Sequence, residues 1–334
     1  MMRIITRSWL VRYALATFAA TSVLGLSTAL AQSNAWPERP VRIIVPFPAG
    51  GAADVLTRVL AEQLQMKLGQ PFVIENRTGA AGNIGMEAGA KAAPDGYTIA
   101  SATIGTLAIN QFLSKGLPYD PERSFAYVST FWMNCNVFLV PSQHNPAKTL
   151  HEFLAWAKAR PQGVTFGSSG AGTTPHLSGE MFRLRTGLKA IHVPSRGAAQ
   201  TIPMLLSGDL DFGIDNLASY TALLQSGQVR ALAVTSAERW PTLPDIPTMA
   251  EAGVPDFVVT SWGAFVMPAG TPPAIVDRLS AAIGESAADP AVQKRFLATG
   301  ARAVATTPKE TVAFVERERQ KWGEVVRASG ARTE

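Results

Sequence analysis

Short apolar runs alternate along this chain with stretches in which apolar residues recur at helical spacing. The run Val41–Val45 leads into a Gly-rich turn at residues 46–54, and apolar side chains then recur every fourth position from Leu56 to Leu68. This pattern predicts a buried strand, a turn and an amphipathic helix that ends at Gly69.

The second half of the chain repeats this alternation. A strand expected at Val164–Phe166 leads into a loop of Gly, Ser and Thr at residues 167–176, and a helix follows to Gly187. Alternating strands and helices predict an α/β fold in which each sheet is mainly parallel and flanked by helices.

Two long apolar segments predict crossings between two lobes. Residues 125–140 are long for one strand and are expected to leave the first lobe, and residues 258–266 are expected to return to it. We predict that lobe 1 comprises residues 32–132 and 259–334 and that lobe 2 comprises residues 133–258, joined by hinge strands. Ligands of such sheets bind outside the carboxyl ends of the strands, where the Gly-rich turns lie.

The first residues have the pattern of a signal peptide. Three arginines within residues 3–12 precede the apolar stretch Tyr13–Leu26, and Ala29–Ala31 has the small residues of a cleavage site. We therefore expect residues 1–31 to direct export to the periplasm and to be removed. A retained membrane anchor is the alternative, although polar residues at 27–28 make the apolar stretch short for a bilayer.

Charge and residue usage exclude several classes of function. The formal net charge of +5 falls close to neutrality without the arginines of residues 1–31, which argues against nucleic acid as a partner. The single Cys135 cannot form an internal disulfide. No metal site or cofactor is predicted, because no close ligand spacing connects the four histidines, His144, His151, His176 and His192.

The two Gly-rich turns carry the candidate chemistry. Each follows a strand and opens a helix, where free backbone N–H groups and the helix dipole favour an anion. The alternative is that each is only a short, well-capped connection. The predicted ligand-binding residues are Phe47, Pro48, Ala49, Gly50, Gly51, Thr103, Ser168, Ser169, Gly172, Thr173, Thr174, His176, Ser195 and Asp215.

Competing interpretations exist for several of these residues. His176 can instead cap or pack a helix start, and Asp215 can accept from a ligand or belong to a helix cap with Asn216. Arg77 and Arg196 are the basic residues nearest to the predicted cleft, where each either contacts ligand or is solvated.

Catalysis is not predicted, although one enzyme class stays as an alternative. Residues 167–171 lack the closing glycine of a serine hydrolase elbow, and His176 lies too near in sequence to act as a triad base. No catalytic residue is therefore assigned. The alternative is a serine-dependent hydrolase that acts on a small carboxylate ester.

The chain resembles the periplasmic substrate-binding receptors of tripartite tricarboxylate transporters, the Bug family. The resemblance covers nearly all of residues 36–327. The matching stretches include Pro46–Gly51, Glu75–Arg77, Gly82–Gly85, Ala93–Thr98, Leu117–Pro121, His192–Pro194, Leu243–Thr248 and Pro268–Pro272.

The resemblance implies a two-lobed periplasmic-binding-protein fold of the Venus-flytrap type. Such a receptor closes on a small organic anion, holds it through the loops at residues 48–51 and 168–174, and delivers it to membrane permease subunits. A monomer is expected, and a sensory partner of a membrane kinase is the alternative with the same fold. The chain departs from the family pattern at residues 195–197, where an aromatic residue and Lys-Gly are usual, and at Ile104 and Leu107.

Overall fold

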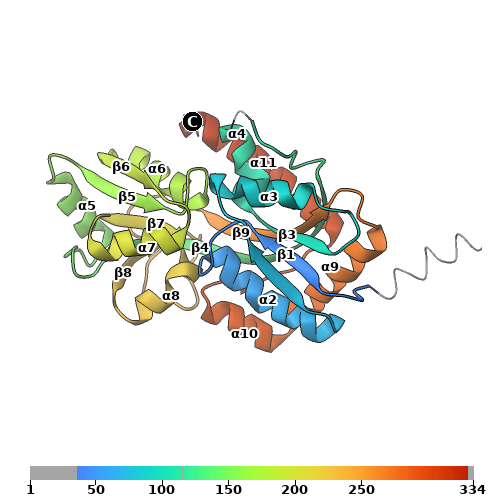
Figure 1. Ribbon diagram of the computed structural model, residues 1–334. Coiled ribbons are helices and arrows are strands. Elements are labelled where there is room, and N and C mark those ends of the chain that lie inside the picture. Colours follow the sequence, from blue (N-terminus) through green and yellow to red (C-terminus); the bar gives the residue numbers. More distant parts are fainter. Residues whose placement is uncertain (1–35, 115, 330–334) are drawn as a thin grey trace, which may run out of the picture. The chain divides into compact units, whose positions relative to one another are not determined.

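The computed structural model describes residues 36–114 and 116–329. The chain divides into two compact units, residues 1–39 and residues 40–334. Only residues 36–39 of the first unit are described, and they form no helix or strand. The predicted signal peptide lies outside the described residues, and all described helices and strands belong to the second unit (Figure 1).

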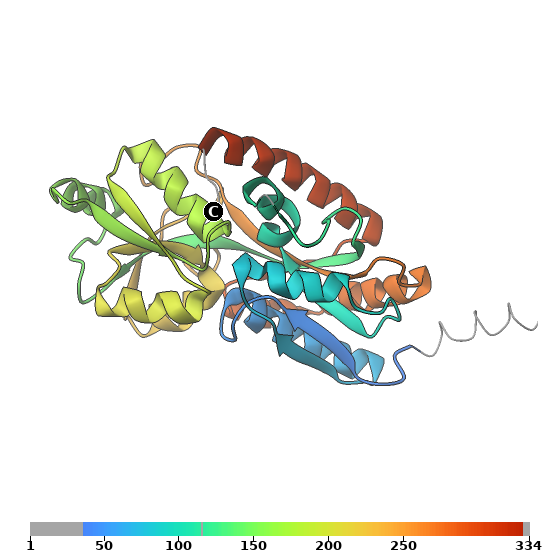
Figure 2. The same cartoon turned by 45° about the horizontal axis from the view of Figure 1, so that its top comes forward.

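Ten strands of the described chain form one sheet, ordered β2-β1-β3-β9-β4-β7-β5-β6, with β8 and β10 also paired to β4. Its first part is parallel, since β1 pairs with both β2 and β3. With this order, right-handed crossovers place α2 and α3 on opposite faces of the three strands, as Figures 1 and 2 show. The elements are β1 (Val41–Val45), α2 (Ala52–Leu68), β2 (Phe72–Asn76), α3 (Asn83–Ala90) and β3 (Thr98–Thr103).

Two long strands cross the middle of the sheet. β4 (Phe125–Pro141) pairs antiparallel with β9 (Thr260–Pro268) as far as Cys135, and from Asn136 onward it pairs with β7 and β8 instead. The long apolar run of β4 is thus explained, since its side chains are buried against both parts of the sheet. The two lobes predicted on either side of this change of partner stay a prediction.

The second part of the sheet repeats the parallel arrangement. β5 pairs in parallel with β6 and β7. The outer strands are therefore parallel, as predicted, whereas β4 and β9 run antiparallel because the chain crosses the sheet and returns. The elements are α5 (Leu150–Lys158), β5 (Val164–Ser168), α6 (Thr174–Thr186), β6 (Ala190–Pro194), α7 (Ala198–Ser207), β7 (Phe212–Asn216), α8 (Leu217–Gln225) and β8 (Val229–Val234).

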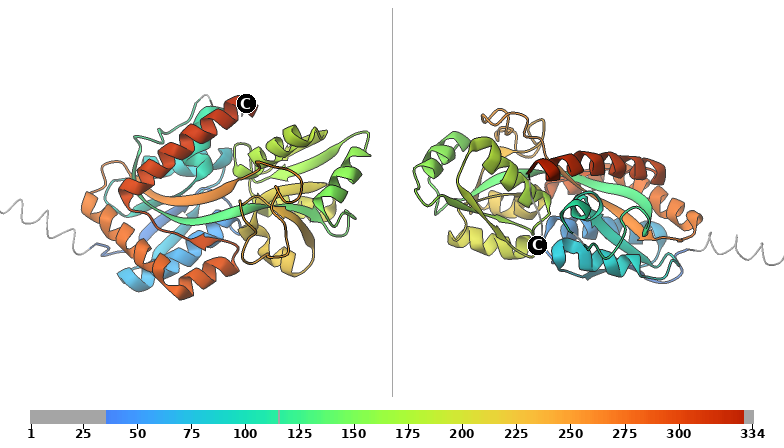
Figure 3. Two further views of the ribbon diagram at one scale, coloured as in Figure 1. Left: turned by 180° about the vertical axis from the view of Figure 1, so that it is seen from behind. Right: turned by 90° about the horizontal axis from the view of Figure 1, so that it is seen from above.

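The last helices return to the first part of the sheet. The longest, α11 (Pro308–Ser329), packs on β4 and on a π-helical turn, η2 (Gly105–Ile109), and Figure 3 shows it crossing β4 and β9. None of the described helices is both long and apolar enough to span a bilayer. The remaining elements are η1 (Ala80–Gly82), α4 (Asn110–Leu113), α9 (Pro273–Ala288), α10 (Pro290–Ala298) and β10 (Arg302–Ala303).

Five aromatic side chains form a cluster in the core around Phe212 of β7. The ring of Phe212 stacks on that of Phe138, with centroids 5.1 Å apart, and also contacts the rings of Phe153, Phe166 and Phe182. All five side chains are fully buried. This ring cluster supports the strand ends from which the second Gly-rich loop starts.

Candidate functional site

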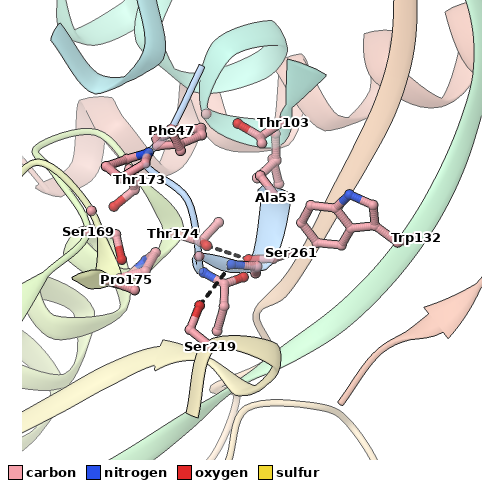
Figure 4. A pocket seen from close by; sticks show the side chains of 18 residues that line it. Phe47, Ala53, Thr103, Trp132, Ser169, Thr173, Thr174, Pro175, Ser219 and Ser261 are labelled. Atoms are coloured by element: carbon pink, nitrogen blue, oxygen red, sulfur yellow. Dashed lines mark hydrogen bonds between the residues drawn. The ribbon is translucent and has the colours of Figure 1, made fainter. Parts of the chain in front are cut away.

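A small cavity lies where four helices begin. Its volume is about 60 Å³, and its wall includes the first residues of α2, α6, α7 and α8 (Figure 4). These residues are Gly51, Ala52, Ala53, Thr173, Thr174, Pro175, Gly197, Ala198, Asn216 and Ser219. The rest of the lining consists of Phe47, Pro48, Thr103, Ile104, Gly105, Trp132, Ser169 and Ser261.

The electrostatics of this cavity come from the backbone. None of its 18 lining residues carries a charge. In none of the four helices does the side chain of the N-cap residue accept a hydrogen bond, whereas Thr149 and Asp289 cap α5 and α10 in this way. One N–H group at the start of α2, that of Ala52, is bonded to Ser219. The first N–H groups of a helix have no intrahelical acceptor and carry the positive end of its dipole. Four such ends around one cavity favour an anion without a formal positive charge.

Hydrogen bonds to the side chain of Asp54 hold the first Gly-rich turn in its conformation. The N–H of Gly50 donates to Asp54 Oδ2 at 3.0 Å, and Asn76 Nδ2 donates to Asp54 Oδ1 at 2.9 Å. Burial alone would raise the pKa of Asp54, but hydrogen bonds from Arg58, Asn76 and Gly50 lower it. The amide of Gly50 therefore already has an acceptor, and Gly51 is the glycine that lines the cavity.

Asp215 accepts a hydrogen bond from the hydroxyl of Ser169. Ser169 Oγ donates to Asp215 Oδ2 at 2.8 Å, and the N–H of Asn216 donates to Asp215 Oδ1 at 2.7 Å. Asp215 is fully buried, which raises its pKa despite these bonds. Because a serine has one hydroxyl hydrogen, Ser169 offers an anion no donor while this bond holds. Asp215 thus holds Ser169 of the second Gly-rich loop in place.

The other hydroxyls differ in what they can offer. Thr173 Oγ1 donates to the carbonyl of Gly170 at 2.7 Å, and Thr174 shares a short hydrogen bond with Ser261. Ser219 Oγ accepts from the N–H of Ala52 at 2.9 Å, so its own hydrogen is left for a ligand. The backbone of Thr103 bonds to the Thr106 hydroxyl, whereas the hydroxyl of Thr103 has no hydrogen-bond partner within the described residues. Thr103 and Ser219 are therefore the lining residues whose hydroxyl groups are free to donate a hydrogen bond to an anion.

Two stacked histidines lie behind the second loop. The rings of His176 and His192 are 4.2 Å apart between centroids, and His192 Nε2 is 2.7 Å from Ser168 Oγ. His176 Nδ1 accepts the N–H of Gly172 at 3.1 Å. Ser168 is completely buried and does not line the cavity. These two hydrogen bonds connect the histidine pair to Ser168 and Gly172 of the second loop.

The histidine pair predicts a loss of stability in acid. Burial, and then the neighbouring His176, lower the pKa of His192 from its usual 6.5 to about 3. The contribution of the neutral ring to stability is therefore complete above pH 6.5 and is lost as the pH falls toward 3, by at most about 1.4 kcal/mol per pH unit for one group. We expect His192→Gln to flatten the dependence of the free energy of unfolding on pH in this window. Superimposable pH profiles of the two proteins, measured by denaturant unfolding, would contradict this.

The structure brings together half of the predicted site residues. Phe47, Pro48, Gly51, Thr103, Ser169, Thr173 and Thr174 line the cavity. The others do not, namely Ala49, Gly50, Ser168, Gly172, His176, Ser195 and Asp215. For both groups of residues, the role in ligand binding stays a prediction.

The predicted ligand-binding residues include the starts of α2 and α6 but not those of α7 and α8. β6 ends at Pro194, shortly before α7 begins at Ala198, and β7 ends at Asn216, directly before α8, so the signal was present as two further strand-to-helix junctions. The lining residues outside the predicted ligand-binding set are Ala52, Ala53, Ile104, Gly105, Trp132, Pro175, Gly197, Ala198, Asn216, Ser219 and Ser261. Ile104 and Gly197 among them belong to the stretches that depart from the family pattern.

The chain matches a known family model over most of its length. The model of the tripartite tricarboxylate transporter family receptor matches residues 56–331. Protein BugT of Bordetella pertussis is 40% identical over 301 residues, which cover 90% of this chain and 92% of BugT.

Solved structures of similar proteins share the fold. The structure of R. palustris Rpa4515 with adipate has a TM-score of 0.86 and 36% sequence identity, and the match covers 88% of this chain and 98% of that one. MatC (Rpa3494) from Rhodopseudomonas palustris with bound malate has a TM-score of 0.81 and 30% identity, with 87% and 100% covered. The mixed α/β architecture is thus that of periplasmic binding proteins.

Proposed function

Because the chain belongs to the tripartite tricarboxylate transporter receptor family, we propose that it captures a small organic carboxylate and delivers it to the membrane permease of such a transporter. The observation that carries this proposal is the uncharged cavity at the start of four helices. The similar proteins crystallised with adipate and with malate support the ligand class. In this proposal the receptor works in the periplasm as a monomer, exported by its signal peptide.

The binding step follows from the donors around the cavity. One carboxylate group would accept from the free N–H groups of α2, α6 and α7 and from the hydroxyls of Thr103 and Ser219, with water bridging the longer gaps. The two predicted lobes would close on it, and two hydrogen bonds fit such a closure. One joins Ala52 to Ser219 and the other joins Thr174 to Ser261, each across the proposed boundary.

We further propose that the ligand is released unchanged. Within the described residues Ser169 Oγ hydrogen-bonds to Asp215 and to no histidine, so it lacks the histidine base of a serine hydrolase. Ser168 Oγ is bonded to His192, but this serine has no exposed surface and lies outside the cavity. The serine hydrolase alternative would require one of these hydroxyls to reach an ester.

The function is tested by calorimetry and thermal unfolding with a panel of carboxylates. A bound acid at one hundred times its dissociation constant should stabilise the fold by about 2.7 kcal/mol. Ser219→Ala should lower the affinity about 5- to 30-fold, because it removes a hydrogen bond to a charged group and leaves the Ala52 amide without its acceptor.

The matched control is Ser226→Ala, at the exposed far end of the same helix, which should leave the affinity unchanged. Absence of a thermal shift with every acid would exclude the proposed function. Formation of a new product, detected by NMR after long incubation with carboxylate esters, would favour the hydrolase instead.

A further inference from the structure

A second, larger chamber adjoins the cavity. Its volume is about 310 Å³, and both spaces are lined by Phe47 and Ser169, which therefore lie at their boundary. The remaining wall comes from residues that the proposed function has not used. They are Pro46, Gly79, Ala80, Ala81, Gly82, Asn83, Asn110, Leu113, Ser114, Gly170, Ala171, Ser195 and Arg196.

Arg196 is the single charged side chain among the residues that line either space. It is exposed, so it lies where the chamber meets solvent. Its backbone N–H donates to Gln200 Oε1 at 3.0 Å, and within the described residues its guanidinium forms no ion pair. The chamber lining contains no acidic residue that could neutralise it.

Asn83 also lines the chamber. Asn83 opens α3, and its Oδ1 accepts from Asn110 Nδ2 at 2.6 Å and from the hydroxyl of Tyr119 at 3.1 Å. With Oδ1 occupied, the amide nitrogen of Asn83 is left to donate. The preceding residues Ala80 and Ala81 hold left-handed backbone, with φ of 46° and 53°, which is uncommon for alanine and is sustained only where the surroundings enforce it.

The sizes of the two spaces limit how a ligand can be placed. At 10–15 Å³ per water-sized group, a cavity of about 60 Å³ takes roughly four to six such groups, which is one carboxylate and a short stretch of carbon chain. A longer molecule with its first carboxylate at the four helix starts can extend past Phe47 and Ser169, which line both spaces, into the chamber.

We propose that the chamber receives the distal acidic group of an elongated dianionic ligand and that Arg196 is the residue that selects it. This inference rests on the proposed function and narrows its ligand class to linear molecules with an acidic group at each end. Hydrogen bonds from a guanidinium to a carboxylate are charge-assisted, but exposure limits their contribution. The selection is therefore a moderate preference for the diacid over the monoacid of equal length.

The test compares wild type with Arg196→Gln and Arg196→Lys. Titration calorimetry measures linear dicarboxylates from succinate to suberate and the matching monocarboxylates from butyrate to octanoate. Arg196→Gln should lower the affinity for the longer dicarboxylates about three- to tenfold, leave the monocarboxylates unchanged, and reduce the effect of salt on diacid binding. Arg196→Lys keeps the charge and should retain most of the affinity.

The outcomes separate the two proposals. If Arg196→Gln weakens diacids and monoacids equally, or neither, the role of Arg196 is overturned while the carboxylate receptor stands. If wild type binds monocarboxylates as tightly as diacids of every length, the chamber does not receive a second acidic group. If no acid of either series binds, the proposed function and this inference both fail.

Discussion

Replacing Ala198 with aspartate should lower the affinity for carboxylates by a factor of about one hundred or more. Ala198 is the first residue of α7, is buried, and lines the cavity. A carboxylate there would accept from the same free N–H groups as the ligand. Two unit charges about 5 Å apart repel by about 3 kcal/mol at an effective dielectric constant near 20, which corresponds to a factor above one hundred.

The fold should tolerate this substitution, because an acidic residue in the first turn of a helix is stabilising. We therefore expect the melting temperature of Ala198→Asp to equal or exceed that of wild type, while calorimetry detects no binding. Ala198→Asn has nearly the same shape without the charge and should bind far more tightly than the aspartate variant. Equal affinities of the two variants would show that bulk, rather than the anion preference of the cavity, governs binding.

Replacing Phe212 with alanine should lower the free energy of unfolding by about 3–5 kcal/mol. Its ring lies at the centre of the five-ring cluster, with centroids 5.1 to 5.8 Å from those of its four neighbours. The substitution would leave a cavity that rings on separate strands and helices cannot fill by small movements. Chemical denaturation followed by circular dichroism measures the change.

The control for this prediction is Ile191→Ala. Ile191 lies on β6, and its exposed fraction is 58%, so its truncation should cost less than about 1 kcal/mol. A loss below about 1 kcal/mol in Phe212→Ala as well would show that the ring cluster does not hold β5 and β7 together.

Most elements of the fold follow from local patterns in the sequence. The four-residue spacing from Leu56 to Leu68 predicts α2, and the long apolar run at residues 125–140 predicts β4 within one residue of its observed end. Such patterns report which side of an element is buried. They do not report which strand lies next to it, so the antiparallel placement of β9 between β3 and β4 became clear only in the structure.

The candidate site divides in the same way. The Gly-rich turns at residues 46–54 and 167–176 both reach the cavity, as expected for loops at the carboxyl ends of strands. Which N–H groups of these turns are free to donate to a ligand does not follow from the local sequence. The N–H of Gly50 donates to the side chain of Asp54, only four residues away, and that hydrogen bond depends on how the turn folds back on α2.

The sequence by itself determined the helix starts, the turns and the apolar strands, because each depends on residues close together in the chain. Only the tertiary structure decided which hydroxyls are left for a ligand. Ser169 is satisfied by a residue 46 positions away, Ala52 by one 167 positions away and Thr174 by one 87 positions away. A hydrogen bond uses up a donor wherever its acceptor lies in the chain, so the chemistry of the cavity is set by contacts that no local pattern contains.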